Sequence, residues 1–182
     1  MIYYVIFNKN RIKCLKYIQK GAILLNKILD FCFTTSKQPV LLKDLLVANV
    51  QHNEKMHVDA AKLGFRLKIG NAYIVYICII SIFAVPLAAI SHKIFANIDS
   101  HASIVAAVIF TAVIFIWFNF FRVWIKDKMS GKVIREAWVV HFPYFPYDEY
   151  RYKIEEIFHK AMKAEIPKKD LEKYILDNLI QE

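Results

Sequence analysis

The sequence predicts an all-α integral membrane protein, a two-span transmembrane helical hairpin flanked by amphipathic cytoplasmic helices. The main observation is a pair of apolar runs, Ile69–Ser91 with 23 residues and Ala102–Phe121 with 20, neither of which contains Asp, Glu, Lys, Arg or His. About 20 apolar residues at ~1.5 Å rise per residue match the ~30 Å hydrocarbon core of a bilayer. Core helices of a soluble protein are the alternative, but that reading suits apolar stretches of about 10–14 residues.

The distribution of charge supports a division into three regions. We expect a basic cytoplasmic helical region at 1–68, a transmembrane hairpin at 69–125 with spans at about 69–91 and 102–123, and a cytoplasmic C-terminal helical region at 126–182. Residues 1–68 contain 12 Lys or Arg against four acids, whereas residues 122–182 contain 12 against 11. A basic segment beside a bilayer favours anionic lipid headgroups as its partner. Nucleic-acid binding, the rival reading, has no fingerprint motif in this sequence.

The N-terminal region is expected to be helical in two stretches. Ile12–Phe33 places apolar residues at alternating three- and four-residue steps, with Lys residues around the remaining surface. This pattern fits an interfacial helix, and equally a helix that faces the core of a small bundle. After a break at Thr34–Pro39, the apolar pattern resumes at Leu42 and predicts a helix to Leu67 that leads through Gly64 and Gly70 into the first span.

The cations that flank the two runs predict the orientation. Lys55, Lys62, Arg66 and Lys68 precede the first run, and five cations from Arg122 to Arg135 follow the second, but the connecting loop holds only Lys93. Short loops with an excess of Lys and Arg stay on the cytoplasmic side. We therefore expect a multi-pass integral membrane protein with both termini in the cytoplasm, located in the cytoplasmic (inner) membrane if the protein is bacterial. The residues expected at the membrane interface are aromatic: Tyr73, Tyr76, Trp117 and Trp124.

Small residues predict where the two spans touch. Ala84 and Ala88 lie in the outer half of the first span, and Ala102 and Ala106 lie in the outer half of the second. In an antiparallel hairpin these residues reach similar depths, so the backbones can approach closely. Pro86 is expected to kink the first span. The hydroxyl of Thr111 is expected to bond back to its own helix.

The C-terminal region is expected to hold short helices around an aromatic stretch. The second helix should continue to about Lys128 and end in a turn at Met129–Gly131, while Val133–Phe142 has a mixed period and stays unassigned. Asp148 is expected to cap a helix that runs to Glu165, and Pro167 to open the last helix. Between them lie four aromatic residues that are candidates for binding a partner: Phe142, Tyr144, Phe145 and Tyr147.

Two Glu-x-x-His pairs are the candidates for metal chemistry, Glu54 with His57 and Glu156 with His159. On a helix, residues at i and i+3 share a face, so that a carboxylate and an imidazole can bind one metal. The run Asn53–His57 resembles the Asn-Glu-Arg-Met-His element of alternative oxidases, and this resemblance implies a membrane-bound di-iron quinol oxidase. It covers five residues, and the hairpin separates the two pairs.

We expect a structural or accessory membrane subunit, which presents cytoplasmic helices at the membrane face and binds a protein partner or a second copy of itself. The spans hold no ionisable residue in their interior, which is the usual mark of an ion or substrate pathway. No catalytic residue and no cofactor is expected. A di-iron carboxylate enzyme is the first alternative and an oligomeric channel or transporter subunit the second.

Overall fold

A computed structural model of the chain describes residues 19–95 and 100–180, except for the side chains at 88, 91–103 and 106. The protein is mostly helical, with 76% of it in helices. Two of the helices are long and apolar enough to cross a membrane, with candidate spans at Ile69–Leu87 and Ala107–His141. The described chain forms two compact units, the first up to Thr34 with Leu67–Ile114 and the second with Thr35–Arg66 and the residues from Phe115 onward.

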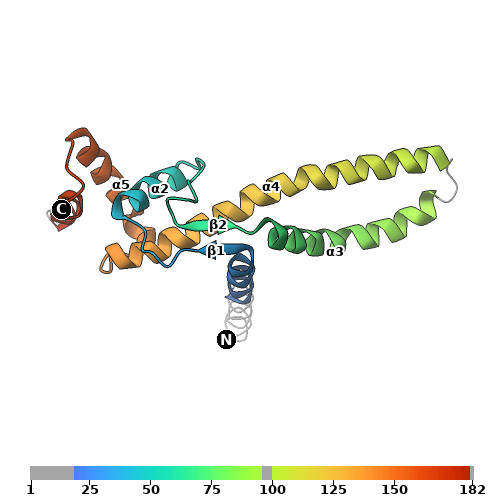
Figure 1. Ribbon diagram of the computed structural model, residues 1–182, viewed down its shortest axis with the longest axis horizontal. Coiled ribbons are helices and arrows are strands. Elements are labelled where there is room, and N and C mark those ends of the chain that lie inside the picture. The colour runs from blue at the N-terminus through green and yellow to red at the C-terminus, as the bar shows by residue number, and fades with distance from the viewer. Residues whose placement is uncertain (1–18, 96–99, 181–182) are drawn as a thin grey trace, which may run out of the picture. The chain divides into compact units, whose positions relative to one another are not determined.

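The first unit contains the helix at 19–32, helix α3 (Ile69–Phe95) and the beginning of helix α4 (Ser100–His141). Figure 1 shows α3 and the beginning of α4 running in opposite directions. A hydrogen bond connects the two helices, because the Tyr76 hydroxyl donates to the Ile114 carbonyl at 2.6 Å. The helix at 19–32 is fixed at its end by Asn71, whose side-chain amide donates to the Phe31 carbonyl at 2.8 Å.

A short antiparallel sheet of strands β1 (Phe33–Thr35) and β2 (Phe65–Leu67) was not expected from the sequence. Its flanking hydrogen bonds run from Ser36 N to Gly64 O and from Lys68 N to Cys32 O. Because of this sheet, the prediction of one helix from Leu42 to Leu67 is wrong. Helix α2 (Leu42–Asn53) ends twelve residues before β2, and Lys55 then adopts a left-handed backbone with φ of 56°.

Helix α4 runs unbroken through the predicted turn at Met129–Gly131, so this prediction is also wrong. Gly131 allows the His52 side chain of α2 to pack closely against α4, since a Cβ at position 131 would lie 3.1 Å from Nε2 of His52. The neighbouring Ser130 hydroxyl is buried and donates to the Lys126 carbonyl one turn earlier. The unassigned stretch after Gly131 is the end of the same helix.

The second unit has a core built on the last five turns of α4. The buried residues of this segment recur at helical spacing: Ile125, Met129, Val133, Ile134, Ala137 and Trp138. Helix α5 (Tyr147–Lys163) packs against both α2 and α6 (Leu171–Ile180). It buries Ile154, Ile157, Phe158 and Ala161, and α6 buries Leu171, Ile175 and Leu179.

The start positions of α5 and α6 differ from those predicted. Pro146 is the N-cap of α5, so Asp148 lies inside the first helical turn and does not cap it. Pro167 belongs to a turn closed by a hydrogen bond from Asp170 N to Pro167 O, and α6 begins after this turn, at Leu171. The two helices themselves were expected, and both are present.

Replacing Gly131 with Leu should lower the apparent unfolding temperature of the purified protein in detergent. An added side chain meets the His52 ring, and overpacking of this kind costs about 1–3 kcal/mol. The double variant Gly131→Leu/His52→Ala should recover at least half of the loss. Gly70→Leu is the control, since nothing lies within 4 Å of a Cβ added there. If removal of the His52 ring restored none of the stability, the close contact would not be the reason for glycine.

Candidate functional site

The first Glu-x-x-His pair does not share a helix face. Glu54 is the C-cap residue of α2, and the left-handed Lys55 turns the chain away from the helix before His57. The prediction that Glu54 and His57 stand one turn apart on a helix is therefore wrong. Among the described residues, no group of three or more His, Cys, Asp or Glu side chains is placed to hold a metal ion.

The second pair does lie on a helix, where Glu156 and His159 are both exposed on α5. Glu156 already has a partner, because its Oε1 lies 2.9 Å from Nζ of Lys160, four residues later. The hydrogen bond and the positive charge of Lys160 lower the pKa of Glu156. This arrangement is a solvated ion pair along one helix face.

Trp138 organises the aromatic stretch that was predicted to bind a partner. Its indole N–H donates to the Phe145 carbonyl at 2.8 Å, and its ring contacts those of Phe142 and Tyr147 at centroid distances of 4.9 and 5.1 Å. Phe142 and Tyr147 are thus buried in the core of the second unit. Phe145 is half-buried, and Tyr144 is 88% exposed. Of the four candidates, Tyr144 is the most exposed.

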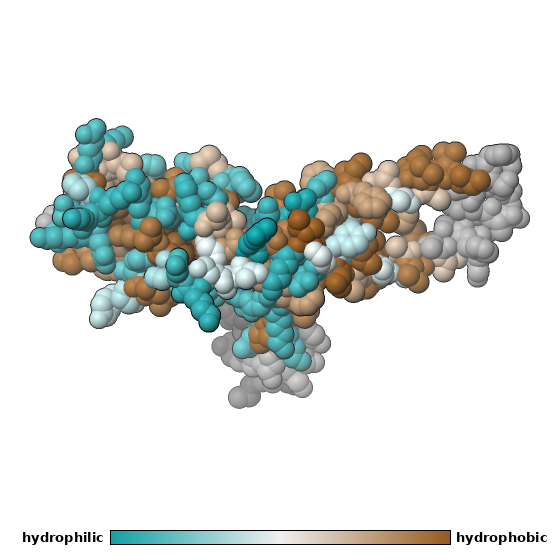
Figure 2. Space-filling view, viewed as in Figure 1, coloured by the Kyte–Doolittle hydropathy of each residue, from teal (hydrophilic) through white to brown (hydrophobic). Residues whose placement is uncertain are grey.

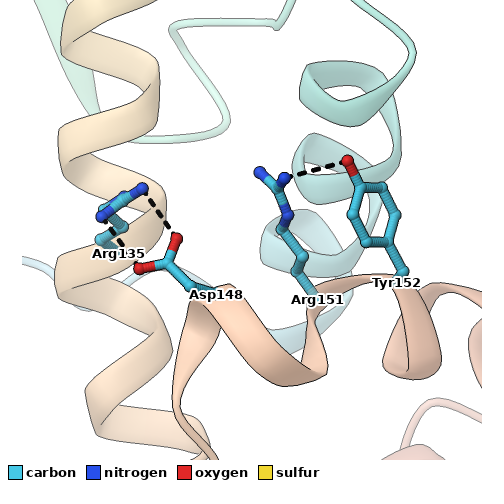
Figure 3. Close-up of polar contacts among 4 residues, drawn as sticks. All are labelled: Arg135, Asp148, Arg151 and Tyr152. Carbon is cyan, nitrogen blue, oxygen red and sulfur yellow. Dashed lines mark hydrogen bonds and ion pairs between the residues drawn. The ribbon is translucent and has the colours of Figure 1, made fainter.

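An ion pair connects α4 to the first turn of α5 (Figure 3). Arg135 approaches the Asp148 carboxylate with both terminal nitrogens, at 2.9 and 3.5 Å. Both side chains are more than half exposed, so solvent screens the pair and its contribution to stability is about 0–1 kcal/mol. The same guanidinium lies 5.2 Å from the centroid of the Tyr147 ring. Burial raises the pKa of Tyr147, although Arg151 and Arg135 oppose this shift.

Two asparagines on α2 connect this helix to α5. Asn49 is fully buried and its amide donates to the Arg151 carbonyl at 3.1 Å, while the Asn53 amide donates to the Glu155 carboxylate at 2.6 Å. Both lie in the stretch that begins at Leu42, whose apolar pattern predicts a helix, and this pattern does not indicate their contacts with α5. The available signal was their polarity at core-facing positions, because a buried amide needs hydrogen-bond partners.

A cleft of about 1000 Å³ opens in the second unit and was not expected from the sequence. Its lining comes from the end of α2 with the following turn, from the middle of α4 and from the first turns of α5. The charged and imidazole groups of the lining are His52, Lys55, His57, Lys126, Asp127 and Arg151. His52 Nε2 lies 4.0 Å from the Asp127 carboxylate. The cleft also has apolar walls, contributed mainly by Met56, Val58, Phe120, Val123 and Trp124.

The residues predicted for the membrane interface and for helix packing differ from one another in exposure. Tyr73, Trp117 and Trp124 are exposed, whereas Tyr76 is buried with its hydroxyl bonded to α4. Ala84 is half-buried in α3. The side chains of the other three packing candidates, Ala88, Ala102 and Ala106, lie outside those that the structure describes. The close contact of small residues therefore stays a prediction.

Replacing Trp138 with Phe should lower the free energy of unfolding by about 1–3 kcal/mol, because the Phe145 carbonyl loses its indole donor while most of the ring packing stays. Thermal unfolding in detergent, followed by circular dichroism, measures the change. Trp124→Phe is the matched control, since Trp124 is 47% exposed on the same helix. Equal unfolding temperatures for the two variants would contradict the role given to the indole.

Comparison with protein-family models, with curated proteins and with solved structures finds no match for this chain. The case for its function therefore depends on its own residues. These provide two exposed apolar helices, a small helical core around Trp138, and a cleft that combines cations with apolar side chains.

Proposed function

We propose that the protein is a two-span integral membrane protein and that its second unit is a cytoplasmic interaction domain of an accessory subunit. One observation carries the membrane part of this proposal. Only 11% of the apolar window in Ile69–Leu87 and 6% of the window in Ala107–His141 are buried, whereas a core helix of a soluble protein is mostly buried. On the face seen in Figure 2, hydrophobic side chains gather over α3 and the first part of α4.

The cost of leaving these side chains in water supports the bilayer as their solvent. Exposed large side chains of α3 include Ile82, Phe83 and Val85, and those of α4 include Ile104 and Val108. Burying one such side chain gains about 1.5–3 kcal/mol, so ten of them left in water would forgo about 15–30 kcal/mol. This exceeds the ~5–15 kcal/mol stability of a typical domain. Insertion of both helices into a bilayer removes the deficit.

The cations that flank the spans favour cytoplasmic termini. Lys62, Arg66 and Lys68 come shortly before α3, while Arg122, Lys126 and Lys128 follow the apolar part of α4. Positive charge near the ends of a span stays on the cytoplasmic side. This orientation puts the whole of the second unit in the cytoplasm.

An exposed apolar surface at the end of α4 supports an interaction role for the second unit. Val139 and Val140 are 66% and 70% exposed, and Tyr144 follows directly after the helix. These residues stand next to the buried Trp138 and Phe142, so a rigid core holds them in place. Exposed apolar side chains on a rigid base, aromatic ones above all, are typical of protein interfaces.

Cysteine labelling in intact cells tests the topology. In a variant without Cys14 and Cys78, Ser100→Cys should react with a membrane-impermeant maleimide, and Asp177→Cys should react only after permeabilisation. The remaining Cys32 is fully buried and burial raises the pKa of its thiol, so it should not compete. Labelling of Asp177→Cys in intact cells would mean that the orientation is opposite to the one proposed. Extraction of the protein from membranes by alkaline carbonate would exclude insertion of the helices into the bilayer.

The interaction role predicts the loss of a specific partner. Purification in mild detergent, followed by mass spectrometry, should identify a stoichiometric partner or a second copy of the chain. The double variant Val140→Glu/Tyr144→Glu should lose this partner, because a charge on each exposed side chain makes burial in an interface costly. The unfolding temperature should stay unchanged. Lys128→Glu, an exposed change on the same helix, should keep the partner. Retention by the double variant would remove this surface from the proposal.

A further inference from the structure

We infer that the cleft of the second unit binds the anionic phosphate headgroup of a membrane lipid. This inference deepens the proposed function and rests on it, because the lipid is supplied by the bilayer that α3 and α4 are proposed to cross. The cleft volume of about 1000 Å³ is at the upper end of the ~300–1000 Å³ range of ligand pockets. It is open rather than enclosed, as the site of a ligand with a long apolar tail has to be.

The charge of the lining favours an anion. Lys55, Lys126 and Arg151 contribute three positive charges, against the single carboxylate of Asp127. Within the described part of the chain, none of these three cations forms an ion pair with a carboxylate. Elsewhere in the second unit, Arg135 and Lys160 do have carboxylate partners, at 2.9 Å in both cases. The cleft therefore collects cations whose charge the described residues leave uncompensated.

The contacts of Arg151 with Tyr152 fix its side chain in a conformation that can bind phosphate. One terminal nitrogen donates to the Tyr152 hydroxyl at 2.9 Å, as Figure 3 shows, and the guanidinium carbon lies 4.4 Å from the centroid of the same ring. Its Nε is buried and finds no hydrogen-bond partner among the described residues. A planar guanidinium offers several N–H donors in a fixed fork that matches phosphate oxygens, and a fixed side chain loses less entropy when an anion binds.

The apolar wall of the cleft distinguishes a lipid from a soluble phosphate. Phe120, Val123 and Trp124 line the cleft with exposed side chains, and they lie at the end of the apolar run Ala102–Phe121 or just after it. In the proposed topology this is the depth at which acyl chains meet headgroups. A soluble anion gains nothing from these side chains, whereas an acyl chain beside them would cover apolar surface near the cations.

Quenching of Trp124 fluorescence tests the site in the full-length protein. The protein is purified in a neutral detergent with Trp117→Phe, so that Trp124 reports while the buried Trp138 serves as an internal reference. Phosphatidylglycerol with brominated acyl chains is the probe, since bromine quenches an indole only at close range. We expect saturable quenching. Brominated phosphatidylcholine, which carries the same phosphate without net charge, should bind more weakly.

Charge variants locate the site. In the double variant Lys55→Gln/Lys126→Gln, the apparent affinity should fall about 10- to 30-fold, because each cation near a lipid surface contributes roughly a factor of five. The double variant Lys62→Gln/Lys128→Gln is the matched control, since it removes the same charge from exposed residues outside the lining. Its affinity should not change. An equal loss in both double variants, at equal unfolding temperatures, would mean diffuse attraction and would overturn the site.

Competition decides the source of the phosphate. Glycerol phosphate at millimolar concentration should fail to displace the lipid, and full displacement would overturn the lipid assignment in favour of a soluble anion. The micelle assay does not require the chain to cross a bilayer. Abnormal cysteine labelling with normal quenching would therefore count against the topology alone, while normal labelling without saturable quenching would count against the cleft alone.

Discussion

Along α4, the pattern of exposed apolar side chains changes at Ile125. The core of the second unit depends on this change. Before it, large apolar side chains such as Val123 and Trp124 are exposed. After it, burial is confined to one stripe, which begins with Ile125 and Met129. A helix that is apolar all round needs an apolar solvent, whereas a helix with one apolar stripe needs a protein partner. One continuous helix meets both requirements in turn, so it must stay helical through Gly131.

The apolar stripe of α4 needs a protein partner, and α2 contributes to it. A helix of 12 residues is marginal in water, so α2 depends on its packing. Leu45 and Leu46 supply buried apolar surface, but this alone does not set the position of the helix along its neighbours. The bonds of Asn49 to the Arg151 carbonyl and of Asn53 to Glu155 do so, since a shift along α5 would take both amide nitrogens away from their acceptors. The close contact between His52 of α2 and Gly131 sets how near α2 lies to α4.

Long-range periodicity made the helices predictable, but their local boundaries depended on contacts that the sequence does not reveal. The apolar runs of α3 and α4 and the pair α5 and α6 were expected, as was the bond from the Thr111 hydroxyl to the Ala107 carbonyl. Gly131 indicated a turn because glycine weakens helices, yet here it makes room for the ring of His52 on α2, which is distant in the sequence. In the same way, the sheet that interrupts the expected helix to Leu67 pairs β2 with a distant strand. The cleft is composed of three separate segments, so no local pattern could have indicated it.

The polar groups within the apolar segments help to decide where chemistry can occur. The Tyr76 hydroxyl is bonded to the Ile114 carbonyl, and the Thr111 hydroxyl is bonded to its own helix. Both bonds satisfy groups that would be costly to leave unpaired in lipid. In the proposed topology, these two bonds would stabilise the apolar segments. The lipid site proposed above lies in the second unit, where the buried Nε of Arg151 finds no hydrogen-bond partner among the described residues.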